Sequence, residues 1–236
     1  MPKILFIGPI SQKCGWSEAS KQFVRALKTV PDIELKVKNV FTGGAYQECQ
    51  DLDILEHTWQ MYDSYDYVIQ NCMPHLFDYD RRFGKNIAWL PFETSGWCNV
   101  WPTKIKMMDA VWTPCKYSDE CLMLSSSPKS HAIIPIPTDV TKYTKDYQPI
   151  IPANLIDNKF LFYFIGEDIQ RKNLDLVIRA FHCEFDKGEQ VGLVIKTSRP
   201  GLDDNQAYTY IDNKINNIKN TLRLYADANQ YRREII

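Results

Sequence analysis

The sequence predicts an α/β fold built on parallel strands with helices on both faces. Two observations carry this prediction. Apolar runs and amphipathic stretches alternate along the chain, and the apolar runs are continuous rather than interrupted at every second residue. Continuous runs are typical of parallel strands that are buried on both faces. The 236 residues, 44% of them hydrophobic, are enough for one large domain or two smaller ones.

The first half of the chain predicts one complete Rossmann-like unit, residues 1–137. Residues 3–7 are the first strand, and GPISQKCGWS is the loop that leads to a helix with Ser17 as its expected N-cap. The apolar residues of that helix recur at helical spacing: Phe23, Ala26, Leu27 and Val30. The later strands are expected at 33–37, 65–71, 86–93, 110–114 and 131–136, with helices at 52–61, 101–108 and 118–124.

A linker and a second unit follow. Residues 137–158 contain three prolines and little periodicity, so residues 138–158 are the expected linker. The pattern then restarts with strands at 160–165 and 191–196 and helices at 173–186 and 204–225. Residues 159–236 therefore predict a second Rossmann-like domain. Two strands and two helices make a poor independent domain, so we expect this one to be incomplete.

Composition excludes several classes of partner. The formal net charge of −1 gives no reason to expect a nucleic acid or an anionic membrane as partner. Seven scattered cysteines without a C-x-x-C motif indicate reduced thiols and no metal site. The start, MPKILFIG, is too short for a signal peptide, and no apolar run could span a membrane. We therefore expect a cytoplasmic protein.

Arg171 and Lys172 are the main candidate site residues. They lie between the strand at 160–165 and the helix that follows it. Ligands of parallel α/β sheets bind beyond the carboxyl ends of the strands, where helix N-termini attract phosphate. Two cations there predict a diphosphate site, although an ordinary solvated helix start would have the same sequence. Lys196 ends the next strand and is expected at the same edge, either in the site or as a surface lysine.

Four residues of the first unit are further candidates. Gly15 could let a phosphate approach the first helix, or could belong to a simple turn. Glu93 follows a buried strand, where it could bind sugar hydroxyls, act as a base, or pair with a cation. His75 also follows a strand, and is either structural or catalytic. Trp97, in a glycine-containing loop, is expected in the core or stacked on a sugar ring.

Four stretches resemble segments of GT-B glycosyltransferases of the retaining family 4 type. The family's glycine loop and first helix resemble CGWSEASKQFVRAL. Its E-T segment resembles AWLPFETSGW, and its P-S segment resembles MDAVWTPCKYSDECL. IIPIPTDVTKY resembles the segment that leads into the second domain. FLFYFIGEDIQRKNLDLVIRAF resembles the opening of the donor domain. Together they cover nearly the whole chain.

The resemblance implies a hexosyltransferase that moves a sugar from a nucleoside-diphosphate sugar to a hydroxyl acceptor, a glycan, lipid or other alcohol, with retention. The first domain would hold the acceptor and the second the donor. Arg171 and Lys172 would stabilise the departing diphosphate without a metal or other cofactor, and Gly15 and Lys196 would help to bind it. His75, Glu93 and Trp97 would lie on the acceptor side.

Two departures from the family shape the remaining expectations. Glu167 stands where the family often has arginine, and the sequence stops before the part of the donor domain in which the family has its E-x7-E segment. We therefore expect little transfer by this chain alone, and a homodimer or a separately encoded C-terminal half as partner. The alternatives are a non-catalytic relative that binds carbohydrate or a partner protein, and an unrelated doubly wound nucleotide-binding protein.

Overall fold

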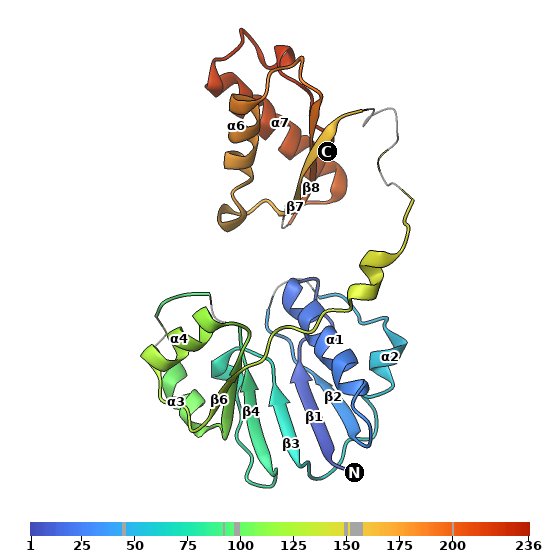
Figure 1. Cartoon of the computed structure of the whole chain (residues 1–236), viewed down its shortest axis with the longest axis vertical. Helices are drawn as coiled ribbons and strands as arrows, with labels where there is room; N and C mark the ends of the chain where they lie inside the picture. Colours follow the sequence, from blue (N-terminus) through green and yellow to red (C-terminus); the bar gives the residue numbers. More distant parts are fainter. Residues whose placement is uncertain (44–45, 92, 97–99, 149–150, 152–157, 200) are drawn as a thin grey trace. The chain divides into compact units, whose positions relative to one another are not determined.

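The chain divides into two compact units, Met1–Lys145 and Asp146–Ile236, and the division falls within residues 138–158. The computed structural model describes residues 1–43, 46–91, 93–96, 100–148, 151, 158–199 and 201–236. Figure 1 shows each unit as a sheet with helices packed against it. In the described residues, none of the helices is both long and apolar enough to cross a membrane.

The first unit contains a six-stranded sheet in the order β2-β1-β3-β4-β5-β6, and every pairing in it is parallel. Its strands are β1 (Lys3–Gly8), β2 (Glu34–Asn39), β3 (Tyr67–Gln70), β4 (Lys85–Trp89), β5 (Ala110–Thr113) and β6 (His131–Ile133). The connections contain α1 (Gly15–Lys28), α2 (Leu52–Leu55), η1 (Pro74–Leu76), α3 (Trp101–Met107) and α4 (Lys116–Ser125), and η2 (Val140–Thr144) follows β6. The predicted parallel α/β architecture is confirmed for this unit.

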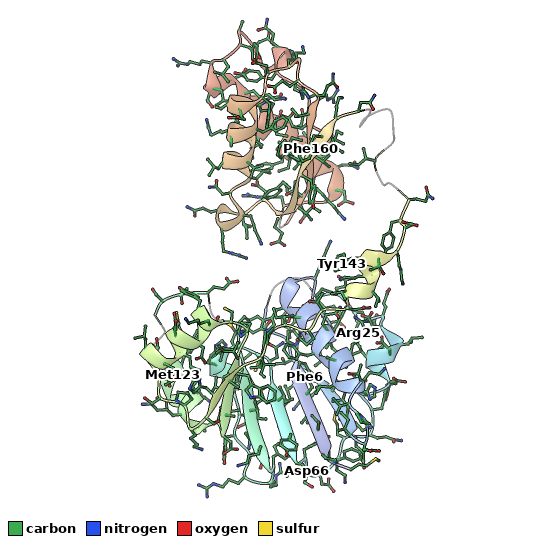
Figure 2. All side chains as sticks on the ribbon, viewed as in Figure 1. Phe6, Arg25, Asp66, Met123, Tyr143 and Phe160 are labelled. Atoms are coloured by element: carbon green, nitrogen blue, oxygen red, sulfur yellow. The ribbon has the colours of Figure 1, made fainter. Side chains whose placement is uncertain are left out.

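Apolar clusters lie on both faces of this sheet. On one face, Phe6 and Trp89 pack against Phe23 of α1, whose ring lies 4.7 Å from that of Trp89. On the other face, Ala88 and Val111 pack with residues of α3 and α4. Arg25, labelled in Figure 2, fastens α1 to the start of α2 through ion pairs with Asp51 and Asp53. Burial of both faces explains why the strands read as continuous apolar runs.

Two helices of this unit differ from the prediction. Ser17 is not the N-cap of α1, because Gly15 and Trp16 are already helical and Cys14 is the capping residue. The expected helix at 52–61 ends at Leu55 instead. Gln60 has φ = 55°, a left-handed conformation that a continuing right-handed helix cannot contain.

The second unit is a βαβα arrangement. It runs β7 (Phe160–Glu167), η3 (Gln170–Lys172), α6 (Leu174–Glu184), β8 (Val191–Ser198), α7 (Asp204–Leu222) and η4 (Ala228–Gln230), and β7 pairs with β8 in parallel. Ile178, Leu193 and Ile215 represent its core, in which both helices pack on the same face of the two strands. β7 extends two residues beyond the predicted strand at 160–165, because Gly166 still pairs with Thr197 and Glu167 with Ser198.

The end of α7 was predicted too late. The helix stops at Leu222 because Arg223 adopts φ = 56°, and Tyr225 instead packs edge-on against Tyr231. Asp203 and Gln206 form a capping box at the other end of the helix. The chain then returns to the sheet, where Ile235 forms a parallel bridge with Val194 of β8.

A buried cluster of ionisable side chains fixes this returning segment, and the sequence analysis did not predict it. Its members are His182, Lys219 and Glu234. The three side chains are 2%, 4% and 3% exposed. Nζ of Lys219 donates to Oε2 of Glu234 at 2.7 Å, and Nε2 of His182 donates to the other carboxylate oxygen. The cluster ties residues 231–236 to α6 and α7.

Candidate functional site

The loop after β7 presents the predicted cations at the carboxyl end of the strand. Gln170–Lys172 form a 3-10 turn, and Asn173 then adopts a left-handed conformation with φ = 53°. The side chain of Asn173 caps α6 by accepting from the backbone N–H of Leu176 at 3.4 Å. The turn and the cap together place Arg171 and Lys172 at the start of an 11-residue helix.

Arg171 and Lys172 are both exposed, and neither forms an ion pair with another described residue. The stem of Lys172 lies along β7, since a Cβ added to Gly166 would be 3.8 Å from Cγ and Cδ of Lys172. Two unpaired cations next to a helix N-terminus form a local positive site that suits an anionic oxygen cluster.

Beneath this loop lies a buried carboxylate that the sequence analysis missed. Asp168 is 2% exposed. It accepts from Nη1 of Arg199 at 3.1 Å and from Nζ of Lys214 at 2.7 Å. Lys214 also contacts Asp175 in the first turn of α6 at 2.6 Å. Burial alone would lower the pKa of Lys214, but its hydrogen bonds to both carboxylates outweigh burial and raise it.

These four charged residues line a pocket of about 300 Å³ together with Ile169, Gln170, Asn173 and Leu174. The two cations and the two carboxylates balance, so the pocket has no excess of positive charge. Arg171 and Lys172 do not line it. The cluster therefore links the ends of β7 and β8 to the start of α6 and the middle of α7. The unbalanced positive charge lies outside it, on the exposed loop.

Lys196 is exposed, but it lies on the other face of the sheet from Lys172. It pairs in register with Ile165 of β7, whereas the helices and Lys172 lie on the face of Phe164 and Gly166. Successive residues of a strand point to opposite faces. The structure thus brings Arg171 and Lys172 together but does not bring Lys196 to them.

Gly15 is the first residue of α1, and it is exposed. A Cβ added to it would have nothing within 4 Å, so the fold itself does not require glycine there. The helix start is fixed from β3: Asn71 accepts from Nε1 of Trp16 and donates to Oγ of Ser20 at 2.9 Å. This rigid helix start leaves open space in front of Gly15.

The acceptor-side candidates lie beyond two other strands. His75 is exposed in η1, after β3, and Glu93 is exposed after β4. Neither forms an ion pair with another described residue. Trp97 lies outside the described residues. The described part of the chain contains no cluster of three or more His, Cys, Asp or Glu side chains that could hold a metal.

Cys115 is a further residue that the sequence analysis did not single out. It is the exposed N-cap of α4, and its Sγ lies 3.4 Å from Oγ of Ser118. Hydrogen bonds from the side chain and backbone of Ser118 lower the pKa of the Cys115 thiol. The sequence signal was a cysteine placed between a strand and the helix that follows it, since a helix N-terminus lowers the pKa of a thiol.

Comparison with known proteins identifies the fold of this chain but no family. No protein-family model matches the chain, and no curated protein matches it. The structure of Anabaena Alr3699/HepE in complex with UDP and glucose is similar over 96% of this chain and 68% of its own, with a TM-score of 0.50 and 14% identity. S. aureus MnaA in complex with UDP is similar over 100% of this chain and 69% of its own, with a TM-score of 0.52 and 13% identity. The predicted α/β, Rossmann-like fold class is therefore confirmed.

Proposed function

We propose that this chain binds a nucleoside-diphosphate sugar and takes part in transfer of the sugar to a hydroxyl acceptor, as in a retaining GT-B glycosyltransferase. The observation that carries the proposal is the pair of exposed, unpaired cations, Arg171 and Lys172, at the end of β7 and the start of α6. In this proposal the second unit is the donor side and the first unit the acceptor side.

The charge distribution explains why this pair, rather than the nearby cations, would hold the diphosphate. Arg199 and Lys214 are already paired with carboxylates, so an anion would have to compete with Asp168 for them. Arg171 and Lys172 have no such competitor among the described residues. Glu167 is exposed at the end of β7, on the opposite face from Gly166 and the stem of Lys172, which limits its repulsion of a bound diphosphate.

The proposed chemistry is electrostatic. Negative charge grows on the diphosphate as the bond to the sugar breaks, and fixed cations lower the free energy of that state most when they need not reorganise. Arg171 can bind two oxygens at once, and Lys172 adds a point charge. No metal is required for this role. Gly15 would allow close approach at the first unit, and His75, Glu93 and Trp97 would contact the acceptor.

Uridine diphosphate is the first nucleotide to test, because two structurally similar proteins were solved with UDP bound. The experiment is calorimetric titration of the 236-residue chain with UDP, and with GDP for comparison. We expect UDP binding that the double variant Arg171→Ala/Lys172→Ala abolishes while circular dichroism stays unchanged.

The matched control removes two lysines elsewhere, Lys106→Ala/Lys187→Ala. Both are exposed, and neither side chain forms a hydrogen bond or ion pair with another described residue. This variant therefore loses the same charge without changing the loop that holds Arg171 and Lys172. UDP affinity equal to that of the parent is expected. If the two double variants weaken binding equally, only net charge matters and the assigned site is wrong. If UDP and GDP both fail to bind the folded parent chain, the donor-side proposal is wrong.

A further inference from the structure

The outer edge of β7 carries backbone groups that pair with no other described strand. Phe160 and Asp168 donate their backbone N–H groups to Gln190 and Ser198 on the β8 side, each at 2.9 Å. In a parallel pair, the N–H and C=O of one residue point the same way, and the direction alternates along the strand. The odd-numbered residues Leu161, Tyr163 and Ile165 therefore direct their backbone groups away from β8. No strand in the described part of the chain pairs with this edge.

Apolar side chains accompany this edge. Tyr163 and Ile165 are 72% and 67% exposed, and they lie on the sheet face that α6 and α7 leave uncovered. Lys159 and Leu161 lie on that same face, because both side chains approach the position of a Cβ on Gly192. Phe160, labelled in Figure 2, is 67% exposed at the start of the strand. An exposed apolar edge of this kind is a site for pairing with another strand.

We propose that two copies of this chain pair through β7, antiparallel, about a two-fold axis at Tyr163. Residues whose numbers sum to 326 then lie opposite each other. Tyr163 faces the partner copy's Tyr163, and Ile165 faces its Leu161. All of these odd-numbered residues direct their N–H and C=O groups outward, so they form the hydrogen-bonded pairs of an antiparallel ladder. This pairing occupies the outer edge of β7 in both copies, so the two-fold contact closes at a dimer.

Charge selects this register. Lys159 and Glu167 are exposed at the two ends of the edge, and in the proposed register each faces the other across the axis, giving two opposite-charge pairs. A shift of the axis by one residue to Phe162 places Lys159 opposite Ile165, and a shift to Phe164 places Glu167 opposite Leu161. On the helix side, the proposed register places Phe160 opposite Gly166, which has no side chain of its own.

β7 has 8 residues, so pairing two copies through this strand creates a small interface. Interfaces below about 1,200 Å² are generally weak, so the dimer should be concentration-dependent.

The test is sedimentation equilibrium of the chain and three variants, up to the solubility limit. Lys159→Glu and Glu167→Lys each create two like-charge pairs, so we expect each to weaken the dimer by roughly tenfold or more. The double variant restores both pairs with their signs exchanged and should dimerise like the parent. A parent chain that stays monomeric overturns the proposal, and so does a double variant that fails to recover.

Crosslinking tests the register independently. Tyr163→Cys brings two thiols to a hydrogen-bonded antiparallel pair with Cα atoms about 5.5 Å apart, which a disulfide can span. Ile165→Cys is the matched control, since in this register its two copies lie several residues apart. Under mild oxidation we expect disulfide dimers from Tyr163→Cys well above the level of the parent and of Ile165→Cys. Equal crosslinking by the two variants would rule out the axis at Tyr163.

Discussion

At the scale of single residues, Gly8 and Gly15 are glycines for different reasons. Gly8 ends β1 at the point where α1 packs directly against the strand. A Cβ there would lie 2.8 Å from Oγ of Ser20, 2.9 Å from the ring of Phe6 and 3.3 Å from the carbonyl oxygen of Asn71. Ser20 and Phe6 are fully buried, so they have little room to move.

Gly8→Ala should therefore destabilise the first unit. Overpacking of a well-packed core costs about 1–3 kcal/mol, and we expect a loss in that range. Urea denaturation followed by tryptophan fluorescence measures it. An unchanged midpoint would mean that α1 can move away from β1 without cost, contrary to the packing described above.

Gly15→Ala should leave the stability of the first unit intact but weaken UDP binding. The fold has space for the methyl group, and alanine is the better helix former, so stability should be equal to the parent's or up to about 1 kcal/mol higher. UDP affinity should fall at least tenfold, because the methyl group fills the space in front of the helix start. Gly188→Ala, which also meets nothing within 4 Å, is the control and should bind UDP like the parent. Unchanged affinity in Gly15→Ala would remove Gly15 from the proposed site.

At the scale of elements, the cluster of His182, Lys219 and Glu234 makes the second unit sensitive to acid. Burial alone would raise the pKa of Glu234, but hydrogen bonds from His182 and Lys219 outweigh it and hold the pKa below the ordinary 4.5. A depressed carboxyl pKa stabilises the folded state fully above the ordinary value. That contribution is lost as the pH falls through the lower folded value.

Glu234→Gln should therefore destabilise the second unit by about 3–5 kcal/mol at neutral pH, because it leaves Lys219 buried without its counter-charge. Because that contribution is complete above the ordinary pKa of 4.5, the difference from the parent should shrink only as the pH falls below that value. Chemical denaturation followed by circular dichroism measures both effects. Glu184→Gln, at an exposed position of α6, is the control. A deficit that does not change with pH would show that the lost packing, not the charge, matters.

The elements also show what the sequence could predict. The strands could be predicted from continuous apolar runs, and the helices from apolar residues that recur about every 3.6 residues. Both signals are local in the sequence. Every predicted strand lies on an observed one. The cluster around Asp168 was missed because its partners, Arg199 and Lys214, are distant in sequence. Lys219 offered a clue: it lies four residues after Ile215, beside the buried stripe of α7, where a lysine needs a buried partner.

At the scale of the whole molecule, each unit has its own core, so we expect two unfolding transitions. All six tryptophans lie in the first unit, so tryptophan fluorescence should report only that transition, while circular dichroism reports both. Gly8→Ala should shift only the unfolding transition of the first unit, and Glu234→Gln only that of the second unit. If either variant shifted both transitions together, the two units would unfold as one cooperative body.

The charge balance in the pocket beneath the loop of Arg171 and Lys172 limits which substitutions this protein can accept in evolution. Two carboxylates, Asp168 and Asp175, share two cations, Arg199 and Lys214, across four elements. Replacing any one of them leaves the charges around the buried carboxylate of Asp168 unbalanced. Related sequences should therefore keep all four or lose them in pairs of opposite sign. Arg171 and Lys172 form no ion pair with a described residue, so this constraint does not apply to them.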